Sequence, residues 1–378
     1  MRICFPDYQL GPKILSLAKS KNILDWLLSR NLEVLYCDGN EVSVFPENRL
    51  ISNDSIIAQK LCQYNEEDVF TLNESGDLYL VYNTASEDNA FLITNRCNSN
   101  CLMCPSPEYV RRNGETASLQ YLMKLVTYFP ETAAHLTITG GEPFLIGKDI
   151  FHFFSSLKEK YHRTNTEFLL LTNGRVFAVP EYCLASNDTL PLRTMIGIPI
   201  HGSNAETHDR ITQAEGSFEQ TKQGIKNMIA LGRMIELRIV VSRLNAEQIG
   251  AIADLFIREF NGAYSVKIMG LEMLGSAFIN RTSVWIPYRE AFLKSVEAIN
   301  KLIYNGFDVQ LYNFPLCAVD RDYWSICAKS ISAEKVRFSE KCSNCAVKDA
   351  CGGLFAGSFR MAEGNVEPIQ EEWYDRAF

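Results

Sequence analysis

Length, composition and charge set the first limits on this protein. The chain has 378 residues, of which 47% are hydrophobic and 22% are charged. Such a chain buries a sizeable core, which excludes wholesale disorder and leaves room for two or three domains or one large α/β barrel. The formal net charge of −8 argues against a nucleic-acid partner bound through bulk positive charge. With no apolar stretch of roughly 18 residues and no signal-peptide pattern, we expect a cytoplasmic protein without a membrane partner.

The first ninety residues predict a small α/β module. An amphipathic pattern favours a helix over Ile14–Ser29. Alternating or β-branched runs favour strands over Glu33–Cys37, Glu41–Phe45 and Asp77–Tyr82. We interpret residues 1–90 as an N-terminal cap or peptide-docking module.

From about residue 91, short apolar runs alternate with longer helical patterns. The strands are expected at Phe91–Asn95, Leu136–Thr139, Phe168–Thr172, Thr194–Ile200, Glu236–Val241 and Ser265–Leu271. The helices are expected at Ser118–Phe129, Asp149–Tyr161, Phe218–Leu231, Ala246–Phe260 and Pro287–Asn305. The connection between the third and fourth strands, rich in Pro, Asn and Asp, should be the least helical. This alternation predicts an α/β fold with a parallel sheet, either a partial (β/α)6 TIM-like barrel over residues 91–306 or an open doubly wound sheet.

Three cysteines directly follow the first of these strands, as Cys97-x-x-x-Cys101-x-x-Cys104. Three thiolates on a short loop can bind three corners of a cubane iron–sulfur cluster and leave the fourth iron open to a substrate. A zinc knuckle is the alternative. A structural zinc needs a fourth ligand, and the nearest downstream histidine is His135, so the spacing favours the cluster.

A Gly-Gly-Glu sequence ends the second strand of this region, within Thr139-Gly140-Gly141-Glu142-Pro143. Paired glycines allow a close backbone approach to a ligand, and a carboxylate can accept a hydrogen bond from an ammonium group. Ligand sites of α/β folds gather at the C-terminal ends of strands, where the cysteines also lie. A tight strand-to-helix turn is the alternative interpretation.

Together the two motifs resemble the radical S-adenosylmethionine (SAM) superfamily. The resemblance implies a partial (β/α)6 barrel and a 4Fe–4S cluster held by Cys97, Cys101 and Cys104. It implies that the SAM amine is held by Gly140, Gly141 and Glu142. Reduction of such a cluster cleaves SAM to methionine and a 5′-deoxyadenosyl radical, which abstracts a hydrogen atom from the substrate. Met103 departs from the aromatic residue that many members place before the last cysteine, but a soft methionine can still cover a cluster.

Weaker matches suggest further SAM contacts. The segment Leu171-Thr172-Asn173-Gly174 looks like the TNG segment of the family, and Arg238 offers a planar fork for the SAM carboxylate. The residues that the resemblance implies as further SAM contacts are Thr172, Asn173, Ser203, Arg238 and Gly270. Ordinary turn chemistry or barrel packing explains each of them equally well. His201 fits a hydrogen-bonded barrel residue and Asp209 a helix cap, and the pattern identifies no catalytic side chain.

A second cysteine group lies near the C-terminus, as Cys342-x-x-Cys345-x5-Cys351. Its spacing resembles the SPASM and twitch extensions of radical SAM enzymes, although Phe355 stands where the full pattern continues with cysteine. The resemblance implies one auxiliary iron–sulfur cluster, of the 4Fe–4S type, in a domain over residues 307–378. We expect the fourth ligand to be Cys317, in a Pro-bounded loop, rather than Cys327, in a helix-like stretch. Zinc bound by four cysteines is the alternative. The other cysteines, which stand apart in the sequence, are expected to be structural: Cys4, Cys37, Cys62 and Cys183.

Several longer phrases look like the radical SAM maturase of the His-Xaa-Ser system. They include Leu136-Thr137-Ile138-Thr139-Gly140-Gly141-Glu142-Pro143, Met269-Gly270-Leu271-Glu272 and Tyr312-Asn313-Phe314-Pro315-Leu316-Cys317. This resemblance implies a ribosomally made precursor peptide as substrate, a partner radical SAM protein and an external electron donor of the flavodoxin or ferredoxin type. Two alternatives stay open. One is a radical SAM enzyme acting on a small molecule, and the other is a zinc-stabilised binding module without catalysis.

Overall fold

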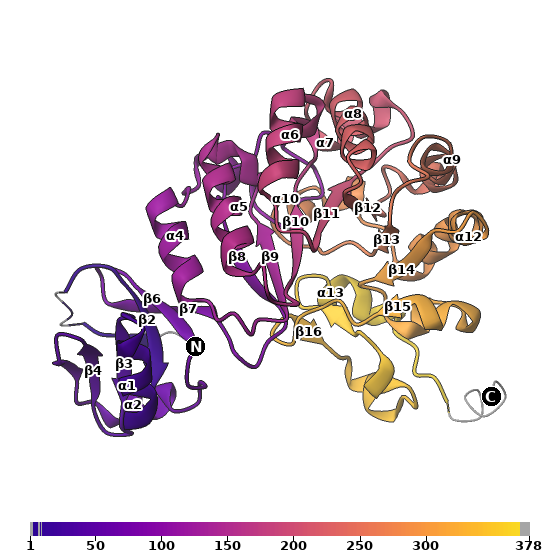
Figure 1. The fold of residues 1–378 in the computed structure, drawn as a ribbon. Helices are drawn as coiled ribbons and strands as arrows, with labels where there is room; N and C mark the ends of the chain where they lie inside the picture. The colour runs from indigo at the N-terminus through magenta and orange to yellow at the C-terminus, as the bar shows by residue number, and fades with distance from the viewer. Residues whose placement is uncertain (1–2, 7, 9, 371–378) are drawn as a thin grey trace.

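Two β-sheets, one after the other along the chain, organise the protein (Figure 1). The computed structural model describes residues 3–6, 8 and 10–370. The N-terminal sheet lies at one end of the molecule, the second sheet curves through its middle, and the cysteine-rich tail lies beyond the last strands (Figure 1). The α/β class predicted from the sequence is confirmed.

The N-terminal sheet has seven strands in the order β1-β7-β6-β2-β3-β4-β5. Their bounds are β1 (Ile3–Cys4), β2 (Lys13–Ala18), β3 (Val34–Cys37), β4 (Val42–Phe45), β5 (Arg49–Ser52), β6 (Val69–Leu72) and β7 (Asp77–Tyr82). The accompanying helices are α1 (Lys21–Ser29) and α2 (Ser55–Leu61).

The helix predicted over Ile14–Ser29 is wrong in its first third. Ile14–Ala18 belongs to strand β2, whose side chains are buried on both faces, and an unbroken apolar run of this kind does not distinguish strand from helix. Ser20 then caps α1, because its hydroxyl accepts a hydrogen bond from the amide of Ile23.

The second sheet has eight strands in the order β15-β14-β13-β12-β11-β10-β9-β8, and all are parallel. Their bounds are β8 (Asn89–Leu92), β9 (His135–Thr139), β10 (Glu167–Leu171), β11 (Thr194–Pro199), β12 (Met234–Val240), β13 (Ser265–Met269), β14 (Asp308–Tyr312) and β15 (Cys327–Ala328). Each crossover steps to the next position in the same direction, whereas a doubly wound sheet reverses its order at a switch point. The partial barrel is therefore confirmed, and its sheet continues past residue 306 through β14 and β15.

Helices connect the strands of the second sheet. Their bounds are α3 (Glu108–Asn113), α4 (Leu119–Tyr128), α5 (Asp149–Lys160), α6 (Pro180–Thr189), α7 (Ala205–Thr212), α8 (Ser217–Ala230), α9 (Ile249–Glu259), α10 (Gly275–Ile279), α11 (Arg281–Val284) and α12 (Tyr288–Tyr304). The five predicted helices correspond to α4, α5, α8, α9 and α12. The connection expected to be least helical contains α6, because Pro180 starts a helix well and Cys183 and Ser186 supply a small buried face.

Short elements complete the described chain. The tail holds β16 (Val336–Arg337), β17 (Leu354–Phe355) and α13 (Phe359–Ala362). Single 3₁₀ turns are η1 (Pro143–Ile146), η2 (Arg175–Ala178), η3 (Ala246–Gln248), η4 (Leu316–Ala318), η5 (Arg321–Ile326), η6 (Glu340–Asn344), η7 (Lys348–Ala350) and η8 (Glu363–Asn365). None of the described helices is both long enough and apolar enough to span a bilayer.

The N-terminal module packs against helix α4 of the barrel. The rings of Tyr82 and Phe129 lie 4.8 Å apart between centroids, within the same apolar core as the barrel strands. Polar contacts add to this junction, because the amide of Glu33 donates to the Tyr128 hydroxyl at 2.9 Å and its carboxylate pairs with Lys124 at 2.5 Å. The module is thus joined to the barrel by a shared core.

Candidate functional site

The three cysteines of the first motif lie on the loop that leaves strand β8. At its N-terminal side the amide of Cys97 donates to the carbonyl of Arg111 at 3.0 Å. Further along, the amide of Asn100 donates to the carbonyl of Thr212 at the end of α7 at 2.8 Å. The carbonyl of Cys104 accepts from the amide of Ala277 in α10 at 3.1 Å. The loop is therefore fixed by elements from both sides of the barrel.

The buried thiols of this loop would need a bound metal cation to become thiolates. Burial raises the pKa of Cys97 to about 11 and that of Cys101 to about 12, and the charges of neighbouring thiolates raise both further. A bound cation overcomes this penalty, because metal binding releases the thiol protons. The loop supplies three thiols, one fewer than a structural zinc ion takes, whereas three thiolates can hold three irons of a cubane cluster. The donor set of the loop therefore fits a cluster better than zinc.

The two glycines after strand β9 are required by contact with the cysteine loop. A side chain on Gly140 would lie 2.4 Å from the carbonyl oxygen of Thr94, and one on Gly141 would lie 2.1 Å from that of Arg96. The same backbones bond to each other, since the amide of Gly141 donates to Thr94 at 2.7 Å. The amide of Glu142 donates to Arg96 at 2.8 Å. The Gly-Gly-Glu motif therefore sets the direction in which the chain enters Cys97.

The carboxylate of Glu142 holds together the loops that follow β9 and β10. It is 2% exposed, and it accepts hydrogen bonds from the Thr172 hydroxyl at 2.9 Å and the Asn173 amide at 2.8 Å. It also accepts from the amide of Phe144 at 3.2 Å. Burial raises the pKa of Glu142 even though these donors favour its charged form. The carboxylate is thus engaged by protein donors, and contact of this carboxylate with a SAM ammonium group stays a prediction.

Two cavities connect these residues with the cysteine loop. One brings Cys101 together with Asn173, His201 and His208. The other is lined by Asn98, Glu142, Asn173 and further residues of η2 and α6. The side chains of Asn98 and Asn173 bond to each other at 2.7 Å. Asn173 lines both cavities, so it lies between the space beside Cys101 and the space beside Glu142.

The other three predicted SAM contacts have protein partners of their own. The hydroxyl of Ser203 donates to Gln248 at 3.0 Å. The guanidinium of Arg238 is paired with the buried Glu236 at 2.6 Å, within the barrel wall. A side chain on Gly270 would lie 2.7 Å from the ring of Tyr288, so close packing explains this glycine. Their contact with SAM stays a prediction.

Two arginines near the loop carry no sequence signal. Arg175 donates to the carbonyl of Asn98 and bonds Gln220. Arg111 is buried beside the cysteine loop. Neither belongs to a spaced motif, so only the folded chain shows them.

His201 is buried as the sequence suggests, but its ring Nδ1 has no hydrogen-bond partner in the described chain. Asp209, expected to cap the start of a helix, lies inside α7, whose N-cap is Asn204, and its carboxylate instead accepts from the amides of Gly216 at 2.7 Å and Phe218 at 2.8 Å where α8 begins.

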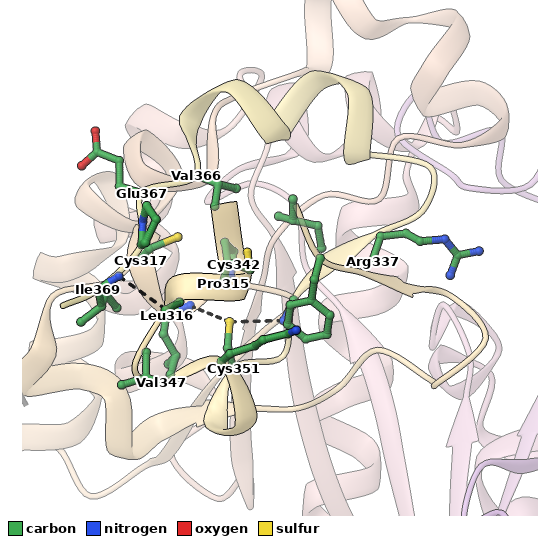
Figure 2. Close-up of a pocket in the computed structure, with 16 residues that line it drawn as sticks. Pro315, Leu316, Cys317, Arg337, Cys342, Val347, Cys351, Val366, Glu367 and Ile369 are labelled. Atoms are coloured by element: carbon green, nitrogen blue, oxygen red, sulfur yellow. Dashed lines mark hydrogen bonds between the residues drawn. The ribbon is translucent and has the colours of Figure 1, made fainter. Parts of the chain in front are cut away.

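The C-terminal cysteines line one cavity. Cys317, on η4 after strand β14, meets three cysteines of the tail there, which are Cys342, Cys345 and Cys351. Figure 2 shows Cys317, Cys342 and Cys351 around this space. Backbone amides point at the sulfurs: Leu316 donates to Cys351 at 3.3 Å and Ile369 to Cys345 at 3.5 Å. Hydrogen bonds of this kind to cysteine sulfur are typical of iron–sulfur sites.

The remaining cysteines lie elsewhere. Cys327 does not line this cavity, and its thiol donates to the carbonyl of Tyr323 at 3.5 Å. Burial raises the pKa of Cys327 to about 12, as expected of a packed thiol. Cys37 and Cys62, far apart in the sequence, meet in the N-terminal module with their sulfurs 3.9 Å apart.

Comparisons with known proteins agree with this geometry. Residues 91–256 match the model of the radical SAM superfamily. The GTP 3′,8-cyclase of Petrotoga mobilis is 27% identical over 44% of this chain and 50% of its own length. The PqqA peptide cyclase of a Methylobacterium species is 23% identical over 55% of this chain and 52% of its own length. The chain thus spans about half the length of these curated relatives.

Among solved structures, SuiB of Streptococcus suis bound to S-adenosylmethionine is similar, with a TM-score of 0.47 and 11% identity. The similarity covers 61% of this chain and 51% of SuiB. The matched residues 91–256 begin in strand β8 and contain the cysteine loop, the Gly-Gly-Glu turn and the Thr172-Asn173 segment. The match to the radical SAM superfamily model therefore falls on the part of the chain that holds all three of these segments.

Proposed function

We propose that this protein is a radical SAM enzyme that modifies a ribosomally made precursor peptide, of the kind matured in His-Xaa-Ser systems. The observation that carries the proposal is the loop of Cys97, Cys101 and Cys104 at the C-terminal edge of a parallel partial barrel. Domains of this superfamily use a 4Fe–4S cluster and SAM. Held by these three cysteines, such a cluster would supply the electron for reductive cleavage of SAM to methionine and a 5′-deoxyadenosyl radical.

In this proposal the chain binds and orients both groups. The three thiolates hold the cluster, and the turn after β9 and the segment after β10 hold SAM. The residues proposed to contact SAM are Gly140, Gly141, Glu142, Thr172, Asn173, Ser203, Arg238 and Gly270. Support is strongest for the Glu142–Thr172–Asn173 network, because it fixes the segment after β10, and Asn173 of that segment lines the cavity beside Cys101.

The cysteine-rich tail is proposed to hold one auxiliary iron–sulfur cluster. Its ligands would be Cys317, Cys342, Cys345 and Cys351, whose common cavity supports this set over one that includes Cys327. We propose the same division of the chain as the sequence suggests. It comprises a cap over residues 1–90, a barrel over residues 91–306 and an auxiliary-cluster domain over residues 307–378.

The proposal of a peptide substrate rests on the longer sequence phrases that resemble a His-Xaa-Ser maturase and on the similarity to a PqqA peptide cyclase. We propose that the N-terminal module recognises an extended part of the peptide at a sheet edge. Electrons would come from a flavodoxin or ferredoxin type donor, and a partner radical SAM protein would act beside this one. A small-molecule substrate is the second candidate, because a GTP 3′,8-cyclase is also similar, with 27% identity over 44% of this chain.

The decisive experiment compares Cys101→Ala with Cys183→Ala in protein purified without oxygen. Reduced wild-type protein should convert SAM to 5′-deoxyadenosine, and Cys101→Ala should abolish this because one corner of the cluster loses its ligand. Cys183 is 3% exposed inside the barrel core, so its variant should retain production. Retained production in Cys101→Ala would contradict the proposal. Colourless protein with stoichiometric zinc would instead support the binding-module alternative.

A further inference from the structure

A buried arginine stands beside the cysteine loop. Arg111, on the short helix α3, is 3% exposed. Its guanidinium donates to the side-chain oxygen of Asn100 and to the carbonyl of Ser106, and to the hydroxyl of Ser276 at 3.1 Å. All three acceptors are neutral.

The positive charge of this guanidinium has no acidic partner among the described residues. Its Nε is also buried without a hydrogen-bond acceptor. A buried charge without a counter-charge is strongly destabilising, so proteins keep one where an opposite charge will be present. The candidates for this opposite charge are the thiolates of the cysteine loop, because two acceptors of the guanidinium, Asn100 and Ser106, flank Cys101 and Cys104 in that loop.

Arg111 is also tied to the loop through its main chain and its partners. Its carbonyl accepts from the amide of Cys97 at 3.0 Å, and Asn100 precedes Cys101 directly. Ser276 belongs to α10, whose Ala277 bonds the carbonyl of Cys104. The guanidinium therefore bonds the chain just before Cys101 and two residues after Cys104, where its charge would act on a cluster bound to this loop.

We propose that Arg111 is the counter-charge of the SAM-binding cluster and raises its reduction potential. This inference rests on the proposed function, because it requires a cluster at the triad. Reduction adds one negative charge to the cluster, and a fixed cation nearby in a poorly solvated site favours the more negative state. Net charge around a cluster is one of the established controls of its potential. Arg111 is thus a positioning and tuning residue rather than a catalytic one.

The test is an EPR-monitored redox titration of reconstituted protein, with the SAM-binding cluster identified by the change of its signal on SAM addition. Arg111→Gln removes the charge and keeps polar atoms, and Arg111→Lys keeps the charge. The matched control is Arg112→Gln, since Arg112 is the next residue but its side chain is 68% exposed and pairs with Glu108. Iron and sulfide content are measured for every variant.

We expect a lower potential in Arg111→Gln, and values close to wild type in Arg111→Lys and Arg112→Gln. Loss of the cluster in Arg111→Gln with its retention in Arg111→Lys would also support the proposal. Equal potentials in wild type and Arg111→Gln, equal shifts in both Arg111 variants, or cluster loss in both would overturn it. A wild-type protein that assembles no SAM-responsive cluster would contradict the proposed function itself.

Discussion

Individual side chains near the site act mainly by holding loops, and His208 shows how such a role depends on charge. His208 is 2% exposed, and its Nδ1 accepts a hydrogen bond from the amide of His201 at 3.1 Å. Burial lowers the pKa of His208 to about 4, although the charge of Asp209 opposes this. The ring must therefore be neutral, because a proton on Nδ1 would face another donor.

The lowered pKa of His208 makes the folded protein less stable as the pH falls. The unfolded chain binds the His208 proton near pH 6.5 and the folded chain does not, so stability is complete above that pH and is lost as the pH falls toward 4. Between pH 7 and pH 5 the loss should be about 2 kcal/mol. In His208→Gln, which keeps an acceptor but cannot be protonated, urea unfolding should lose less stability over this range.

The control for this measurement is the exposed His162. His162→Gln changes a histidine whose side chain is exposed and contacts neither His201 nor His208, so its unfolding curves should follow those of the wild type. Identical curves for wild type and His208→Gln between pH 7 and pH 5 would show that the buried ring does not carry the effect.

The residues of the site differ in how far the sequence reveals them. Cys97, Cys101 and Cys104 are visible because their spacing is dictated by local loop geometry. Glu142 is visible as a residue, but its hydrogen bonds to the loop after β10 arise only when two strands become neighbours. Arg111 gives no signal, since a lone arginine in a short polar helix has the pattern of a solvated surface residue until α10 covers it.

At the scale of elements, a strand can be predicted from the sequence only as far as its burial produces a recognisable apolar pattern. Strands β9 to β13 were predictable because parallel strands covered by helices form short apolar runs between turns. Strand β2 has the same character, but α1 follows it after two residues, and the two were merged into one predicted helix.

The predicted strands over Glu33–Cys37 and Glu41–Phe45 are confirmed as β3 and β4. Strand β5 was missed, since its residues are only partly buried at the edge of the sheet.

That edge strand makes the docking proposal testable. Strand β5 pairs only with β4 in the described sheet, and its Leu50 is 50% exposed. An added peptide strand would cover this side chain, which contributes about 1 kcal/mol when the rest of its apolar area is buried. Leu50→Asp should therefore weaken binding of a His-Xaa-Ser precursor peptide about fivefold or more, measured by calorimetry.

A point variant is better here than removal of the module. Deleting residues 1–90 would uncover the core shared with α4, where Tyr82 meets Phe129. The matched control is Leu192→Asp, an equally drastic change at a leucine that is 82% exposed on the barrel. Peptide affinity that falls equally in both variants, or in neither, would argue against the edge of β5 as the docking site.

At the scale of the whole molecule, the barrel and the tail meet at the second cysteine cavity. Cys317 is anchored to the sheet directly after β14, while its three companions lie in a tail with few regular elements. The sequence predicted these four cysteines as one set, but it placed the end of the barrel near residue 306, before strands β14 and β15. Length and composition do not show such an extension, because β15 has only two residues.

A cluster at this cavity would cross-link the tail to the sheet. Such a link restricts the open states of the tail, in the way that metal binding couples to folding in small metal domains. Cys317→Ala should therefore lower iron content from about eight to about four per chain and make residues 329–369 sensitive to limited proteolysis, with residues 89–312 still protected. Cys327→Ala, which removes a thiol outside the cavity, should leave both iron content and the cleavage pattern unchanged. Mass spectrometry of the fragments distinguishes the two variants, and tail cleavage in Cys327→Ala with protection in Cys317→Ala would reverse the assignment of the fourth ligand.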